Sequence, residues 1–180
     1  MKYFVSRSTG GLYLSQLHAQ IPDDATEITQ EQYEAFKGQS VIWSDSGVPS
    51  LYKPEHDKEV IRAAIAGACN ATILEGFIST ALGAEHRYPA KLTDQSNLQA
   101  SVLESLFPGL DEDWTTPFWC QDAAGTWAYR PHSAAQIQRV GSDGKAAINA
   151  CIRQKIQLEE QLAKAQTLAE VEAITWTAPQ

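Results

Sequence analysis

The sequence has few of the features that identify an enzyme or a membrane protein directly. It contains no C-x-x-C, no phosphate-binding glycine loop, no G-x-S-x-G and no H-E-x-x-H pattern. No apolar run approaches the roughly 20 residues that cross a bilayer. The first residues, MKYFVSRSTGG, lack the apolar core of a signal peptide. We therefore expect a cytoplasmic protein, with no membrane partner.

Basic residues are also scarce, because 14 Lys and Arg stand against 22 Asp and Glu, giving a formal net charge of -8. Nucleic-acid binding needs clustered basic side chains that displace counterions from phosphates, so we expect no nucleic-acid partner. The three cysteines, Cys69, Cys120 and Cys151, are odd in number, far apart and set in apolar neighbourhoods. They are predicted to be buried reduced thiols.

The four histidines do not form a metal-binding pattern, because none is spaced at i, i+4 or lies beside a second ligand. We therefore expect no catalytic residue, no metal and no cofactor. An enzymatic alternative would gather His86, Asp94 and His132 into an acid–base or metal cluster. The competing interpretation is that these polar groups bond the buried backbone of tight connections.

The composition is typical of a globular protein: 43% of the 180 residues are hydrophobic and 20% are charged. Its patterns predict an α+β fold with a small β-rich module at residues 1–53. The module's predicted elements are hairpins of residues 3–5 with 12–14 and of 41–43 with 48–51, and a short helix at 30–37. Thr29 and Gln32 have the spacing of a helix capping box.

Lys53-Pro54 marks the predicted start of a larger, mainly helical domain at residues 54–180. Apolar residues recur every fourth position from Ile61 to Phe77, which predicts one long helix that stops at Gly83. Gly67 and Gly76 fall inside this helix, where close approach of another backbone would compensate for their low helix propensity.

The rest of this domain is predicted to hold short elements in quick succession. A strand at residues 86–90 precedes a helix that Asp94 opens, with Leu98, Val102, Leu103, Leu106 and Phe107 on one side. A loop over 109–117 then leads into a hairpin at 118–130. Ser133 and Gln136 cap a long helix that is predicted to bend between Gly141 and Gly144, and Thr167 caps a last short helix.

Aromatic side chains are the candidate binding residues of the larger domain. Strand alternation places Trp127 and Tyr129 on one face of the predicted hairpin. Together with Trp119 they are predicted to line a ligand groove, against the alternative that they fill a core or a subunit interface. Asp94, Asn97 and Ser133 have a sufficient structural role as helix-start residues.

Short patterns along the chain resemble those of phage tail proteins. In the first module they resemble the start of phage tail fibre assembly proteins, through Tyr3-Phe4-Val5, Gly10-Gly11-Leu12-Tyr13, Ile21 to Ala25, Thr29 to Tyr33 and Asp45 to Pro49. In the larger domain they resemble an uncharacterised domain of phage and prophage tail-region proteins, through Gly76-Phe77, Leu82-Gly83, Tyr88, Asp94 to Leu98, Gly125-Thr126-Trp127, His132 to Gln136 and Thr167 to Trp176.

The resemblance implies a chaperone for the trimeric receptor-binding fibre of a contractile tail, whose partner is the C-terminal region of the fibre protein. Retention on the fibre tip is one variant of this role. The thin core of the first module and its aromatics, Tyr3, Tyr13, Trp43 and Tyr52, predict a fibre-binding surface there. A structural tail or adhesin component that binds a ligand through the Trp119 and Trp127 hairpin is the alternative from another class.

Overall fold

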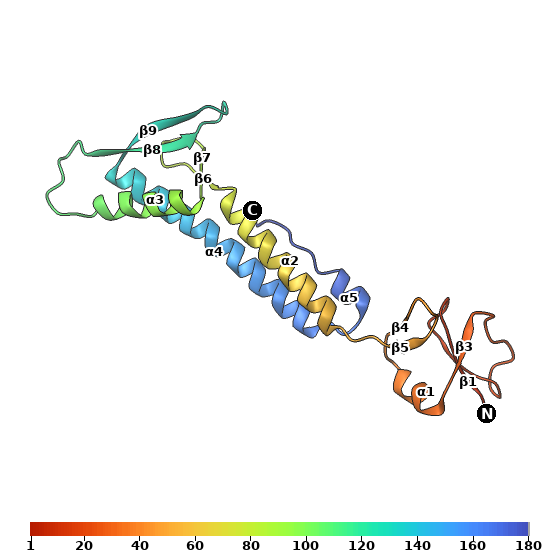
Figure 1. Ribbon diagram of the computed structural model, residues 1–180. Coiled ribbons are helices and arrows are strands. Elements are labelled where there is room, and N and C mark those ends of the chain that lie inside the picture. The colour runs from red at the N-terminus through yellow and green to blue at the C-terminus, as the bar shows by residue number, and fades with distance from the viewer. Residues whose placement is uncertain (180) are drawn as a thin grey trace. The chain divides into compact units, whose positions relative to one another are not determined.

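The computed structural model describes residues 1–179 and confirms an α+β fold with a β-rich N-terminal region and a mainly helical remainder (Figure 1). Its contacts group the chain into two compact units. Unit 1 comprises Met1–Ile61 and Gln161–Ile174, and unit 2 comprises Arg62–Glu160 with the chain from Thr175 onward. The boundary predicted after residue 53 therefore falls within the first segment of unit 1.

The N-terminal part of unit 1 forms a three-stranded antiparallel sheet in the order β2-β1-β3 and a two-stranded β4-β5 hairpin. Its elements are β1 (Tyr3–Ser6), β2 (Leu12–Leu14), β3 (Ala25–Ile28), α1 (Gln30–Phe36), β4 (Val41–Trp43) and β5 (Pro49–Leu51). Both predicted hairpins and the helix are confirmed. The strand β3 was not predicted, because its turn-rich flanks resemble a loop until β1 supplies a pairing partner.

A small hydrophobic cluster of Val5, Ile28 and Phe36 holds these elements together. At the start of α1, the Gln32 amide donates to Thr29 Oγ1 and the Thr29 amide donates to Gln32 Oε1, which confirms the predicted capping box. Gly38 follows the helix with a φ of 69°, a backbone angle that glycine adopts without strain.

The helices α2 (Glu55–Leu74) and α4 (Ala134–Lys164) contribute residues to both units, and the short α5 (Leu168–Glu172) belongs to unit 1. The prediction that the first long helix continues to Gly83 is wrong, because α2 ends at Leu74. Gly76 follows with a φ of 97°. The apolar residues after it form the strand β6 (Phe77–Ser79). The every-fourth-residue pattern of apolar residues therefore continues past the end of the helix.

The sheet of unit 2 has the strand order β6-β7-β8-β9, with every neighbouring pair antiparallel. Its other strands are β7 (His86–Tyr88), β8 (Thr115–Gln121) and β9 (Trp127–Ser133), and α3 (Leu92–Glu104) lies between β7 and β8 in the chain. The predicted loop over 109–117 is wrong in its last residues, because β8 begins at Thr115. The predicted β7 strand and β8-β9 hairpin are confirmed.

The core of unit 2 lies between one face of this sheet and the helices α3 and α4. Its buried members are Phe77, Tyr88, Ala90, Phe118, Cys120, Ile137 and Val140. Leu98 and Val102 of α3 pack against it. Leu103, Leu106 and Phe107 were predicted on the same side, but they are exposed.

The helix α4 is uninterrupted between Gly141 and Gly144, where the bend was predicted. Both glycines allow neighbouring side chains to pack closely against the helix. A Cβ on Gly141 would lie 2.8 Å from Val102 Cγ2, and one on Gly144 would lie 2.8 Å from Phe77 Cζ. Glycine at these two positions lets α3 and β6 approach the helix. At the N-terminus of α4, Ser133 and Gln136 form the predicted capping box.

The cysteine prediction is confirmed, because Cys69, Cys120 and Cys151 are free and buried. Burial, the largest cause, raises the pKa of the Cys151 thiol. Within residues 1–179, no helix is both long and apolar enough to span a bilayer.

Candidate functional site

An aromatic cluster covers the solvent-facing side of the β8-β9 hairpin. Trp119 is in register with Tyr129, and the next pair on the same face is Gln121 with Trp127. The Trp119 ring lies 6.1 Å from that of Trp127, nearly parallel at 14°, and 4.8 Å from that of Tyr129. Trp119 is 38% exposed and Tyr129 is 71% exposed. The intervening residues of β8, Phe118 and Cys120, point into the core instead.

A groove of about 420 Å³ lies between this hairpin and α3. One wall is a single face of α3, because the positions 94, 97, 101 and 104 recur at helical spacing. That wall carries Asp94, Asn97, Ala100, Ser101 and Glu104, and the rest of the groove is lined by Pro89, Pro117, Phe118, Trp119 and Tyr129. The groove lining thus combines aromatic side chains of the hairpin with polar and acidic side chains of α3.

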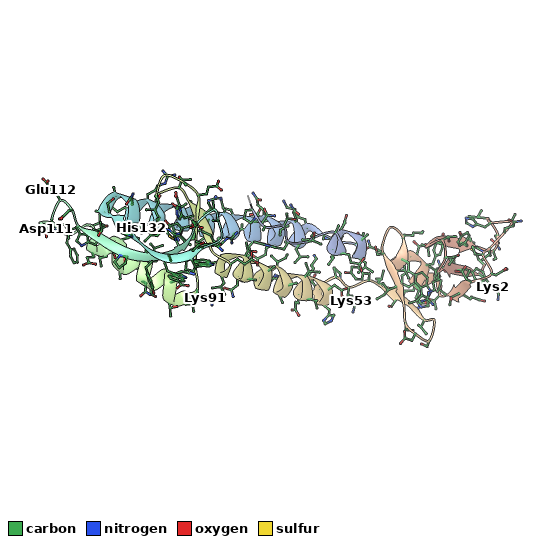
Figure 2. The ribbon with its side chains drawn as sticks, turned by 90° about the horizontal axis from the view of Figure 1, so that it is seen from above. Lys2, Lys53, Lys91, Asp111, Glu112 and His132 are labelled. Carbon is green, nitrogen blue, oxygen red and sulfur yellow. The ribbon has the colours of Figure 1, made fainter. Side chains whose placement is uncertain are left out.

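Both charged side chains that line the groove are acidic: Asp94 and Glu104. Asp94 also stabilises the start of α3, where its Oδ2 accepts a 3.0 Å hydrogen bond from the backbone amide of Lys91. Lys91 lies at the start of that helix in Figure 2, and it is not one of the residues that line the groove. The groove therefore presents carboxylates beside aromatic rings without a basic side chain in its lining.

The structure brings together part of the predicted ligand site and adds residues to it. Trp119 and Tyr129 line the groove, whereas Trp127 stacks on Trp119 without lining it. Asp94 and Asn97, interpreted from sequence as helix-start residues, line the same groove. Ser101 and Glu104 were missed, although their spacing from Asp94 and Asn97 along one helix face was a signal that could have found them.

The second polar feature of unit 2 is buried. Tyr88 Oη lies 2.8 Å from His132 Nε2, and His132 Nδ1 lies 2.8 Å from the Arg130 carbonyl oxygen. Because a carbonyl oxygen only accepts, Nδ1 carries the proton and Nε2 accepts from the tyrosine hydroxyl. Burial, the largest cause in each case, lowers the pKa of His132 and raises the pKa of Tyr88. His132, labelled among the strands and helices of unit 2 in Figure 2, is fully buried.

The structure does not assemble His86, Asp94 and His132 into a metal cluster. His86 Nδ1 lies 3.0 Å from the Ala84 carbonyl oxygen, while Asp94 binds the backbone at Lys91. Across residues 1–179 no three or more His, Cys, Asp or Glu side chains are placed to hold a metal ion. Each of the three side chains thus bonds to backbone, as in the competing interpretation.

The four aromatics predicted to bind a partner in the N-terminal module are partly buried and do not share one environment. The Tyr3 ring lies 5.0 Å from that of Tyr33, and Tyr13 Oη lies 2.9 Å from Thr9 Oγ1. Trp43 packs against the cluster of Val5, Ile28 and Phe36. The Trp43 indole nitrogen and the Tyr52 hydroxyl are buried without a hydrogen-bond partner among residues 1–179. Their role in binding stays a prediction.

Part of the chain matches the model of a protein family. The model of a family described as "Domain of unknown function (DUF4376)" matches residues 56–175. No curated protein matches the chain. No solved structure matches it either.

Proposed function

We infer that this chain, which belongs to the DUF4376 family, is a binding protein rather than an enzyme. Its specific role, in this proposal, is to assist the assembly of a phage or phage-derived tail fibre. The family description assigns no activity. The proposal therefore rests on the resemblance of the N-terminal patterns to tail fibre assembly proteins and on the surface of unit 2.

The observation that carries a binding role is the aromatic cluster of Trp119, Trp127 and Tyr129 on the solvent face of the sheet. Aromatic side chains are costly to leave in water and are enriched at protein interfaces. Further apolar side chains are exposed just beyond α3, where Leu106 is 62% and Phe107 is 55% exposed. Grouped exposed apolar residues of this kind mark interaction surfaces.

A fibre tip is a partner that needs such a surface. Intertwined trimers depend on strand pairing between distant segments, which is slow and leaves strand edges and apolar faces open to aggregation. A factor that covers those faces is expected to raise the yield of soluble trimer more than the stability of the finished trimer.

Co-expression tests the proposal. The C-terminal region of a fibre protein encoded beside this chain is produced alone, with the full chain, and with the Trp119→Ala/Tyr129→Ala variant. The wild-type chain should convert aggregated fibre into soluble trimer, and the double variant should do so less well. Leu92→Ala is the matched control, because Leu92 is also exposed but does not line the groove. An equal trimer yield with and without the chain would contradict the proposal.

A structural tail or adhesin component is the second candidate, favoured by the groove of about 420 Å³ beside Trp119 and Tyr129. Grooves of this size with aromatic walls and a few polar groups suit small ligands. Mass spectrometry of purified particles separates the two candidates. A stoichiometric amount of the chain favours a structural component or retention on the fibre, and its absence favours a transient chaperone.

A further inference from the structure

We propose that the groove between α3 and the β8-β9 hairpin binds an extended segment of the partner through two basic side chains, arginine or lysine. This inference rests on the proposed function and names the chemistry of the partner at one site. The two carboxylates of the groove would hold the cationic ends, and the ring of Trp119 would lie against one of them.

Charge complementarity selects a cationic occupant. Asp94 and Glu104 are the charged lining residues, and both are acidic. The whole chain has a net charge of -8, which adds a long-range attraction for a basic segment. Tryptophan and tyrosine faces attract cations through the ring quadrupole, and Trp119 and Tyr129 both line the groove. An arginine suits both kinds of lining residue, because its planar guanidinium stacks on rings and binds carboxylates.

The spacing of the two carboxylates sets the spacing of the two cations. Asp94 and Glu104 are ten positions apart on α3, which is about 15 Å along the helix axis. An extended chain advances about 3.3 Å per residue, so about 15 Å corresponds to four or five residues. Basic residues at i and i+4 also point to the same side of an extended segment. Such a segment matches the groove.

Two other occupants fit the groove less well. A neutral sugar could stack on Trp119 and bond to Asn97 or Ser101, but it would gain no charge attraction from Asp94 and Glu104. Addition of a partner strand to the free edge of β9 is disfavoured by Pro131, which lacks the backbone N–H that a strand ladder needs. The groove is therefore the better seat for an extended segment.

Binding of a defined peptide tests the inference on the full chain. The probe is a blocked Gly-Arg-Ser-Gly-Ser-Arg-Gly peptide, and its control carries glutamine in place of both arginines. Titration calorimetry at about 50 and 500 mM salt should show tighter binding of the arginine peptide at low salt, because exposed charges are screened at the higher concentration. The glutamine peptide should bind weakly at both concentrations.

Variants locate the binding site. Glu104→Gln should weaken binding of the arginine peptide by roughly 2- to 5-fold, the range of an exposed charge pair, and Trp119→Ala by roughly 2- to 30-fold, the range of a cation–π contact. Glu104 is the cleaner test, because it is exposed and its side chain makes no hydrogen bond within residues 1–179. Glu112→Gln is the control, because it removes the same charge from the loop between α3 and β8. Figure 2 labels Glu112 away from His132. This variant should leave peptide binding unchanged.

Each outcome separates this inference from the proposed function. Equal binding of both peptides, loss of binding in Glu112→Gln as well, or tighter binding of a neutral oligosaccharide such as maltopentaose overturns the cationic occupant. The same variants are then used in the fibre co-expression assay. If the wild-type chain does not raise the trimer yield, the proposed function fails. If it does, and Glu104→Gln and Trp119→Ala raise the yield equally, the groove inference fails while the function stands.

Discussion

The hydroxyl of Tyr88 donates a 2.8 Å hydrogen bond to Nε2 of His132, and both side chains are fully buried. The pair joins β7 to β9 across the sheet of unit 2 and lies next to Phe118, whose ring centroid is 6.2 Å from that of Tyr88. Both groups are held neutral by burial. The pair is a hydrogen bond inside an apolar core, so its loss should lower the free energy of unfolding.

Tyr88→Phe should lower the free energy of unfolding by about 1 to 3 kcal/mol, because it leaves the His132 Nε2 acceptor buried and unpaired. Urea denaturation followed by circular dichroism measures the change. Tyr129→Phe is the matched control, since Tyr129 is mostly exposed, and its effect should stay within about 0.5 kcal/mol. Equal stabilities of the two variants would contradict a structural role for the Tyr88 hydroxyl.

The stability of the protein should fall as the pH drops below 6.5. Burial is the largest cause that lowers the pKa of His132 from the ordinary value of 6.5, and the charges of His86 and Arg130 lower it further. Between the folded and unfolded pKa values the unfolded chain binds more protons, so acid favours unfolding there. The stabilising contribution is complete above pH 6.5 and is lost as the pH falls toward the folded pKa.

The measurement is the free energy of unfolding at about pH 7.5 and 5.5 for the wild type and for His132→Asn. The difference between the two pH values should shrink in the variant. An NMR titration of the His132 imidazole in the folded wild type gives an independent readout. A pKa at or above 6.5 would show that the buried ring tolerates its charge.

Gly76→Ala should destabilise the protein strongly, whereas Gly67→Ala should stabilise it. Gly76 has a φ of 97°, and an added Cβ would overlap the backbone carbonyl oxygen of Tyr88. Gly67 lies inside α2 with nothing within 4 Å of an added Cβ. Replacing it should therefore gain up to about 1 kcal/mol of helix stability. Thermal melting of both variants checks the pair. A neutral Gly76→Ala would mean that the turn after α2 relaxes freely.

Trp43→Ala should lower the stability of unit 1 by roughly 2 kcal/mol, because Trp43 packs against the cluster of Val5, Ile28 and Phe36. Val48→Ala, in the same hairpin region but exposed, serves as the control. Unfolding is measured by denaturation and binding by capture of the fibre. Loss of capture with unchanged stability would instead identify Trp43 as a binding anchor of the N-terminal module.

Local chemistry made much of the secondary structure predictable from the sequence. The capping boxes at Thr29, Ser133 and Thr167 form between residues three positions apart, so their spacing is sufficient to predict them. The turn at Asp122 is also local: its carboxylate accepts from the amides of Ala124 and Thr126. The alternation of the second strand then placed Trp127 and Tyr129 on one face, and the register of the hairpin adds Trp119 to it.

The errors arose where a long-range partner decided the outcome. Phe77 continues the apolar spacing of α2, yet it belongs to β6 because it pairs with Tyr88 of β7. The glycines at 141 and 144 lie in an uninterrupted helix, and the close approach of Val102 and Phe77 there depends on residues far away in the chain. The strand β3 likewise depends on pairing with β1.

The sequence by itself determined the α+β class, the caps, the hairpins and the aromatic face, because each depends on residues close together in the chain. Tertiary structure alone decided that Asp94 and Glu104 of α3 would line one groove together with Trp119. The two walls are separated in sequence by the loop before β8. No local pattern specifies such a juxtaposition, since it follows from the shared core of Phe77, Tyr88 and Val140 against which helix and hairpin pack.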